Sequence, residues 1–131
     1  MKKIKFLFLF FPVLILAACS GNNPEAVAEK FNEALYMGDF ETAKSFCTDD
    51  SKQAVDFVAA FASKSVEQMK KCDVQYEVKN VTMAEDGNSA VVEGVVNGSL
   101  DLQKNEVQDS VVSKLNLVKN GNKWLVEYKL K

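Results

Sequence analysis

The stretch NPEAVAEKFNEALYMGDFETAKSF, residues 23–46, decides the fold because it encodes two helices and the corner between them. Asn23 is suited to cap a helix whose first residue is Pro24, where a missing backbone N–H has no cost. Four apolar residues then recur at helical spacing and form one stripe: Val27, Phe31, Ala34 and Leu35. Gly38 ends this helix and Asp39 starts the next, so the sequence predicts a tight helix-to-helix corner.

A third helix of about 20 residues is predicted from DDSKQ, residues 49–53, where Asp50 and Gln53 have the spacing of a capping box. Its apolar residues cover an arc of about 200°, which is wider than one packing surface needs. Two interpretations stay open. The helix is wedged between a sheet and another helix, or Phe57 and Phe61, which lie to the side of the main stripe, line a pocket or contact a partner.

The apolar period changes from helical to alternating after Cys72, which predicts strands. The alternation changes phase near Lys79 and Asn80, as expected at a β-bulge. Asp-Gly at 86–87 and Asn-Gly at 120–121 predict tight turns. Helices followed by an antiparallel meander with one apolar face indicate an α+β fold, in which N-terminal helices pack on a curved four-stranded antiparallel sheet.

Two further stretches, DGNSAVVEGVV at 86–96 and VKNGNKWLVEYKL at 118–130, complete a pattern together with residues 23–46. The pattern resembles small bacterial lipoprotein domains of unknown function in the nuclear transport factor 2-like superfamily, which have the cystatin-like cone fold. The matching positions are Gly38, Asp39, Gly121 and Trp124. The resemblance implies a cone with an apolar cavity, which superfamily members use as an active site or to bind a ligand, whereas others only dimerise through the sheet.

The N-terminus carries a predicted export signal over residues 1–18, with a cationic start, an apolar middle and small residues at the cleavage site. LAAC, residues 16–19, resembles the bacterial lipobox, in which the cysteine becomes the lipidated N-terminus. The resemblance implies a membrane anchor through lipid on Cys19. A lipidated cysteine and short tether over 19–23 would then precede a single domain over 24–131.

Export and lipid anchoring define the expected localisation. In the lipoprotein class an Asp after the cysteine favours retention at the inner membrane, and this chain has Ser20 there. We therefore expect the outer membrane, with the domain facing the periplasm, and display on the cell surface is the alternative.

Composition narrows the classes of function. The chain has 16 basic and 18 acidic residues, and three of the lysines lie within residues 1–18, so the exported part carries a net charge of about −5. An acidic surface argues against nucleic acid as a partner. The chain contains no His and no Arg, so it lacks the commonest general base and metal ligand and also the bidentate clamp for carboxylates or phosphates. We expect no metal and no cofactor.

Asp109 is the one weak candidate for a catalytic residue. It shares strand parity with Val111, Leu115 and Leu117, so in a regular strand it would point into the cone. Burial would raise the pKa of its carboxyl and suit it to act as a general base. A phase slip at Val111–Val112 would instead turn Asp109 toward water, and no catalytic residue is assigned.

Four aromatic residues are candidates for lining a ligand pocket: Phe57, Phe61, Tyr76 and Tyr128. Both tyrosines have core parity, and buried tyrosines mostly pack their rings and find one hydrogen-bond partner.

Cys47 and Cys72 are left once Cys19 is assigned to the lipid. An oxidising compartment favours a disulfide between them. However, a helix of about 20 residues would hold them roughly 30 Å apart, so two separate thiols are the other interpretation.

Three hypotheses for function follow. The first is a non-catalytic, lipid-anchored domain that binds a small apolar ligand or a protein partner. The alternatives are a small cone enzyme that transfers protons through Asp109 and a tyrosine, and a structural envelope protein that forms a homodimer through its sheet.

Overall fold

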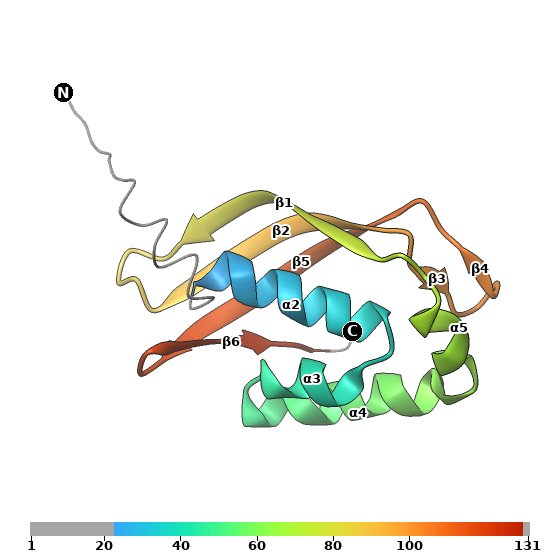
Figure 1. Cartoon of the computed structure of the whole chain (residues 1–131). Coiled ribbons are helices and arrows are strands. Elements are labelled where there is room, and N and C mark those ends of the chain that lie inside the picture. Colours follow the sequence, from blue (N-terminus) through green and yellow to red (C-terminus); the bar gives the residue numbers. More distant parts are fainter. Residues whose placement is uncertain (1–22, 130–131) are drawn as a thin grey trace.

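The computed structural model describes residues 23–129, in which a helical layer covers one face of a four-stranded antiparallel sheet (Figure 1). The helices are α2 (Pro24–Tyr36), α3 (Phe40–Ser45), α4 (Asp49–Phe61) and α5 (Val66–Lys70), with a 3₁₀ turn, η2 (Ser63–Ser65), before α5. The sheet has the order β1-β2-β5-β6, formed by β1 (Gln75–Met83), β2 (Ser89–Asn97), β5 (Ser110–Asn120) and β6 (Lys123–Glu127). The predicted α+β fold is confirmed.

The first two helices follow the local signals of the sequence. The Asn23 side chain accepts a hydrogen bond from the Ala26 backbone N–H at 2.8 Å, and Pro24 begins α2 as predicted. Gly38 has a φ of +83°, a left-handed conformation that ends the helix at little cost for glycine. The Asp39 carboxylate then accepts from the Thr42 N–H at 3.3 Å and caps α3.

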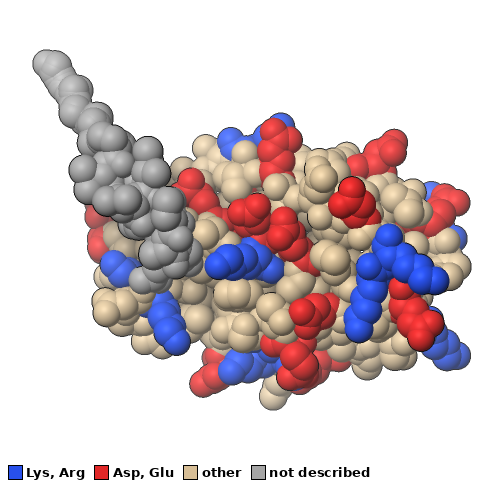
Figure 2. All heavy atoms as spheres, in the orientation of Figure 1, with Lys and Arg blue, Asp and Glu red and all other residues tan. Residues whose placement is uncertain are grey.

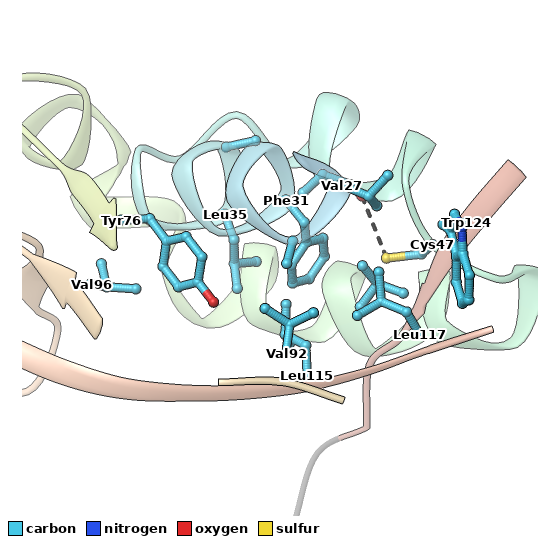
Figure 3. Packing of buried hydrophobic residues seen from close by; sticks show 14 of the residues in the cluster. Val27, Phe31, Leu35, Cys47, Tyr76, Val92, Val96, Leu115, Leu117 and Trp124 are labelled. Carbon is cyan, nitrogen blue, oxygen red and sulfur yellow. Dashed lines mark hydrogen bonds between the residues drawn. The ribbon is translucent and has the colours of Figure 1, made fainter. Parts of the chain in front are cut away.

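The core lies between α2 and the concave face of the sheet. Phe31 and Leu35 of α2 point toward side chains of β2 and β5, among them Val92 and Leu117 (Figure 3). Phe31, Val92 and Leu117 are fully buried. β2 alternates between inward and outward side chains along its whole length, as its sequence predicts.

The predicted bulge and turns are also confirmed. The register between β1 and β2 shifts between Val78 and Asn80. Gly87 and Gly121 have positive φ values in the two hairpin turns.

α4 is the element that differs most from expectation. The prediction of a single helix of about 20 residues is wrong, because α4 ends at Phe61 and the chain turns there. The turn buries Ala62 and Met69 with Leu100 in a second, smaller hydrophobic cluster. The predicted capping box of Asp50 and Gln53 is wrong as well, because the helix begins one residue earlier, at Asp49. Thr48 precedes α4 and its hydroxyl bonds the Ser51 hydroxyl at 2.7 Å.

α4 is not wedged between two layers. It packs against α3 and the edge of the sheet at β6, and its buried residues are only Ser51 and Val55. The wide apolar arc therefore leaves Phe57 and Phe61 in solvent.

The connection after β2 contains a small hairpin. β3 (Leu100–Asp101) pairs with β4 (Glu106–Val107), so Val107 belongs to this hairpin and the long strand β5 begins only at Ser110. Within residues 23–129, no helix is long and apolar enough to cross a membrane.

The side chain of one strand packs tightly on the backbone of the next. Tyr76 of β1 lies directly over Gly94 of β2, where a Cβ atom would come within 2.6 Å of the tyrosine hydroxyl and would also clash with the Glu77 carbonyl oxygen. The Tyr76 hydroxyl is buried and has no hydrogen-bond partner among the described residues. Gly94 is thus required for close approach rather than for an unusual backbone conformation.

We predict that Gly94→Ala lowers the free energy of unfolding by about 2–3 kcal/mol, because the added methyl group must displace a strand carbonyl and an aromatic ring. Urea denaturation followed by circular dichroism measures the change. Tyr76→Phe is the matched control at the same contact. It removes a buried hydroxyl without a partner, so stability should stay unchanged or rise by about 1 kcal/mol. A Gly94→Ala protein as stable as wild type would contradict the prediction.

Candidate functional site

The interior of the cone is occupied by its own side chains. Phe31, Val92, Val96, Leu117 and Val126 are each fully buried between the helices and the sheet. The resemblance implied an apolar cavity in this position, and the structure fills that space with packed residues instead (Figure 3).

An open groove of about 580 Å³ lies on the outside of the helical layer, where α2, α3 and α5 meet. We call it the corner groove. Its apolar lining residues are Ala34, Met37 and Phe46, and its polar and charged ones are Lys30, Glu33, Asp39, Thr42 and Lys70. No sequence pattern singled out this set, because its members come from three separate helices.

The groove is shaped by the Gly38 corner. The backbone N–H of Asp39 donates to the Ala34 carbonyl at 2.9 Å, which turns the chain sharply from α2 into α3. A Cβ on Gly38 would lie 3.3 Å from Val66 of α5, so α5 packs closely over the glycine. This contact places Lys70, at the end of α5, on the rim of the groove opposite α2.

The charges around the groove are of both signs. Two lysines and two carboxylates line it, and Figure 2 shows lysines and acidic residues interspersed on the face that carries α2. Burial raises the pKa of the Glu33 carboxyl, and the carboxylate of Glu29 raises it further. The arrangement is suited to an apolar group flanked by polar or charged atoms.

The four predicted pocket residues do not form one pocket. Phe57 and Phe61 are 64% and 63% exposed on α4, whereas Tyr76 is buried in the core. Tyr128 packs against Phe31 with ring centroids 5.3 Å apart, and burial, followed by the nearby Tyr36 and Cys47, raises its pKa to about 12. The two tyrosines are packing residues of the core.

Asp109 does not point into the cone. It is exposed in a bend between β4 and β5, because β4 ends at Val107 and the long strand begins only at Ser110. The predicted phase slip at Val111–Val112 is absent, because β5 alternates regularly from Val111 to Leu117 and pairs with β2 without a register shift. Asp109 faces water because it lies before the strand. An exposed carboxylate lacks the desolvated environment that a general base of this kind needs.

The structure keeps Cys47 and Cys72 as separate thiols. Cys47 is buried and donates a hydrogen bond to the Ala43 carbonyl at 3.4 Å, drawn as a dashed line in Figure 3. Burial raises the pKa of its thiol to about 11, although the nearby Lys52 opposes the shift. Cys72 is half-buried and contacts the Gln68 carbonyl. Cys19 lies outside the described residues.

No group of three or more Cys, Asp or Glu side chains within residues 23–129 is arranged to hold a metal ion. The lining residues of the corner groove include no cysteine and no serine.

We predict that the two thiols differ sharply in reactivity. In the chain from residue 19 carrying Cys19→Ser, dithionitrobenzoate at pH 8 should label Cys72 in the folded protein and Cys47 only in urea. At that pH a thiol with a pKa of about 11 is about one part in a thousand thiolate, and Cys47 is also shielded. Cys72→Ser should abolish the fast reaction. If no thiol reacts in urea without reductant, a disulfide is present and the structural assignment is wrong.

Comparisons with known proteins identify the fold. No protein-family model matches the chain, and no curated protein matches it. A crystal structure from Campylobacter jejuni, named as a proposed NTF2-like transpeptidase, is similar to it with a TM-score of 0.58 and 23% sequence identity. The similarity covers 82% of this chain and 99% of that one. The shared arrangement of helices on an antiparallel sheet shows that the chain has the nuclear transport factor 2-like α+β cone fold.

Proposed function

We propose that the protein is a lipid-anchored bacterial lipoprotein whose domain binds a small ligand or a protein partner in the corner groove without catalysing a reaction. The observation that carries the binding role is the groove itself. An apolar floor of Ala34, Met37 and Phe46 lies among charges of both signs, whereas the interior of the cone is occupied by packed side chains.

The proposed anchor rests on the lipobox-like residues that end at Cys19. Only three residues, Ser20 to Asn22, separate Cys19 from Asn23, where the described domain begins, and the four residue steps from Cys19 to Asn23 span at most about 14 Å. Lipid on Cys19 would hold the domain against the membrane surface. The same residues support the proposed location, the periplasmic face of the outer membrane, with the cell surface as the alternative.

Three observations favour binding over proton-transfer or acyl-transfer chemistry. Asp109 is exposed, and the thiol of Cys47 is both buried and protonated at neutral pH. Each reactive serine or cysteine would also need a base other than histidine, because the chain has none. The transpeptidase activity in the name of the Campylobacter protein is therefore not part of the proposal.

The outer face of the sheet supports a second candidate function, dimerisation in a structural role. Val112 of β5 is 79% exposed on this face and lies opposite Val95 of β2. Charged neighbours surround the pair, among them Glu93 and Lys114, so the apolar surface is small. We rank it second to the groove.

We predict that the native protein carries lipid on Cys19. In cells grown with radiolabelled palmitate, the wild-type chain should be labelled and fractionate with the membrane, because diacylglycerol and an added acyl chain bind a bilayer firmly. Cys19→Ser should lose both properties. Cys72→Ser is the control and should retain them. An unlabelled wild-type protein would refute the anchor and leave the groove untouched.

We predict that protein purified from its native host carries a bound molecule in the groove. Native mass spectrometry should show an additional mass that is reduced at least about tenfold by Lys30→Glu combined with Lys70→Glu, since each reversal removes a charge contact worth about 1 kcal/mol or more. Lys114→Glu combined with Lys119→Glu changes the net charge equally on the sheet and should retain the mass. The groove is not the site if wild type carries no additional mass or both pairs retain it.

A further inference from the structure

The solvent side of α4 carries one continuous stripe that no part of the described domain covers. Its exposed members on α4 recur at spacings of three and four residues, and one more lies in the 3₁₀ turn that follows: Asp50, Gln53, Phe57, Ala60 and Phe61, and then Lys64. This is the spacing at which one helix packs along another. Two phenylalanines that are each more than 60% exposed, four residues apart on a single helix, are costly in water and indicate a contact surface.

The charges of the stripe are arranged symmetrically about Phe57. Asp50 lies seven residues before it, in the first turn of α4, and Lys64 lies seven residues after it, in the 3₁₀ turn that follows the helix. Both charged residues are exposed, and neither takes part in an ion pair among residues 23–129. The stripe is thus negative at one end, aromatic in the middle and positive at the other end.

We propose that the stripe binds the same stripe of a second copy of the chain, with the two α4 helices antiparallel and the two-fold axis at Phe57. In this arrangement Asp50 faces the partner's Lys64, and the symmetry repeats the pair at the other end. Phe57 stacks on the partner's Phe57, and Phe61 covers the partner's Gln53. A parallel arrangement would place like charges opposite each other at both ends, so the charge pattern selects the antiparallel one.

A lipid bilayer fits the stripe less well. Helices that lie in a membrane interface are rich in lysine and arginine on their polar side. α4 exposes three acids, Asp49, Asp50 and Asp56, against the single lysine Lys52, and Lys64 follows it. This balance repels an anionic surface, whereas an antiparallel copy offers a Lys64 to the Asp50 at each end of the stripe.

The expected contact is weak because it is small. α4 is 13 residues long, or about 20 Å, and a single helix pair buries less than the roughly 1,200 Å² of a standard interface. We therefore expect dissociation constants in the micromolar range or above. This inference goes beyond the proposed function and depends on neither the groove nor the anchor.

Sedimentation equilibrium of the chain from residue 19, carrying Cys19→Ser, tests the proposal from micromolar to near-millimolar concentration. Wild type should dimerise reversibly, and Phe57→Ser should weaken the dimer by about tenfold or more, because this side chain occurs twice at the axis. Lys64→Asp alone should weaken it as well, since each ion pair becomes a repulsion. Asp50→Lys combined with Lys64→Asp should restore wild-type association, a rescue that a folding defect cannot produce.

Val112→Ser on the sheet is the control, and it should leave the dimer unchanged. A monomer at every concentration would overturn the proposal, as would a dimer that Val112→Ser abolishes and Phe57→Ser does not. So would flotation of the monomeric chain with phosphatidylglycerol vesicles that Phe57→Ser eliminates, because the stripe would then be a membrane contact. The substituted residues on α4 are exposed, and circular dichroism verifies that each variant folds.

Discussion

The backbone contact between the α3–α4 connection and the last strand fixes the helical layer on the sheet. The Val126 N–H donates to the Phe46 carbonyl at 2.7 Å, and the Thr48 N–H donates to the Val126 carbonyl at 3.0 Å, so Cys47 forms a parallel bridge with β6. Ser51 extends the contact by accepting from the Tyr128 N–H at 2.9 Å. The open edge of β6 is thereby covered, which protects it from pairing with another chain.

This contact also determines the position of α4. Because Thr48 is held at the sheet edge, the helix that starts at Asp49 runs along that edge beside α3 and cannot enter the space between α2 and the sheet. One narrow side of α4 is buried at Val55, and the opposite side is left in solvent with Phe57 and Phe61. The exposed aromatic residues are a consequence of the bridge rather than of poor packing.

Features that depend on residues close in sequence could be predicted, whereas features that depend on residues far apart in sequence could not. The cap at Asn23, the corner at Gly38 and the bulge before Asn80 depend on neighbouring residues, so sequence patterns suffice for them. The position of α4 depends on a backbone bridge to residue 126, which leaves no trace in local spacing. The orientation of Asp109 stayed open for a related reason, since the β3–β4 hairpin before it carries no strong turn signal.

The candidate site was predictable only in part. Gly38 and Asp39 mark the corner, but Lys70 reaches it only because α5 turns back to bury Met69 beside Leu100. Tyr76 and Tyr128 were correctly predicted to face the core, but they fill the cone and do not line a pocket. Tyr76 lies on Gly94 with its hydroxyl unpaired.

The corner groove and the stripe on α4 can be occupied at the same time. The corner groove is lined by α2, α3, α5 and the residues between them, and no residue of α4 contributes to it. The stripe on α4 involves none of the groove residues, and the residues that hold α4 to α3 and the sheet, such as Val55, face the other way. A dimer formed through Phe57 would therefore leave each groove open. Binding in the groove and pairing through α4 can be removed separately, because exposed substitutions far apart with no shared partner act independently.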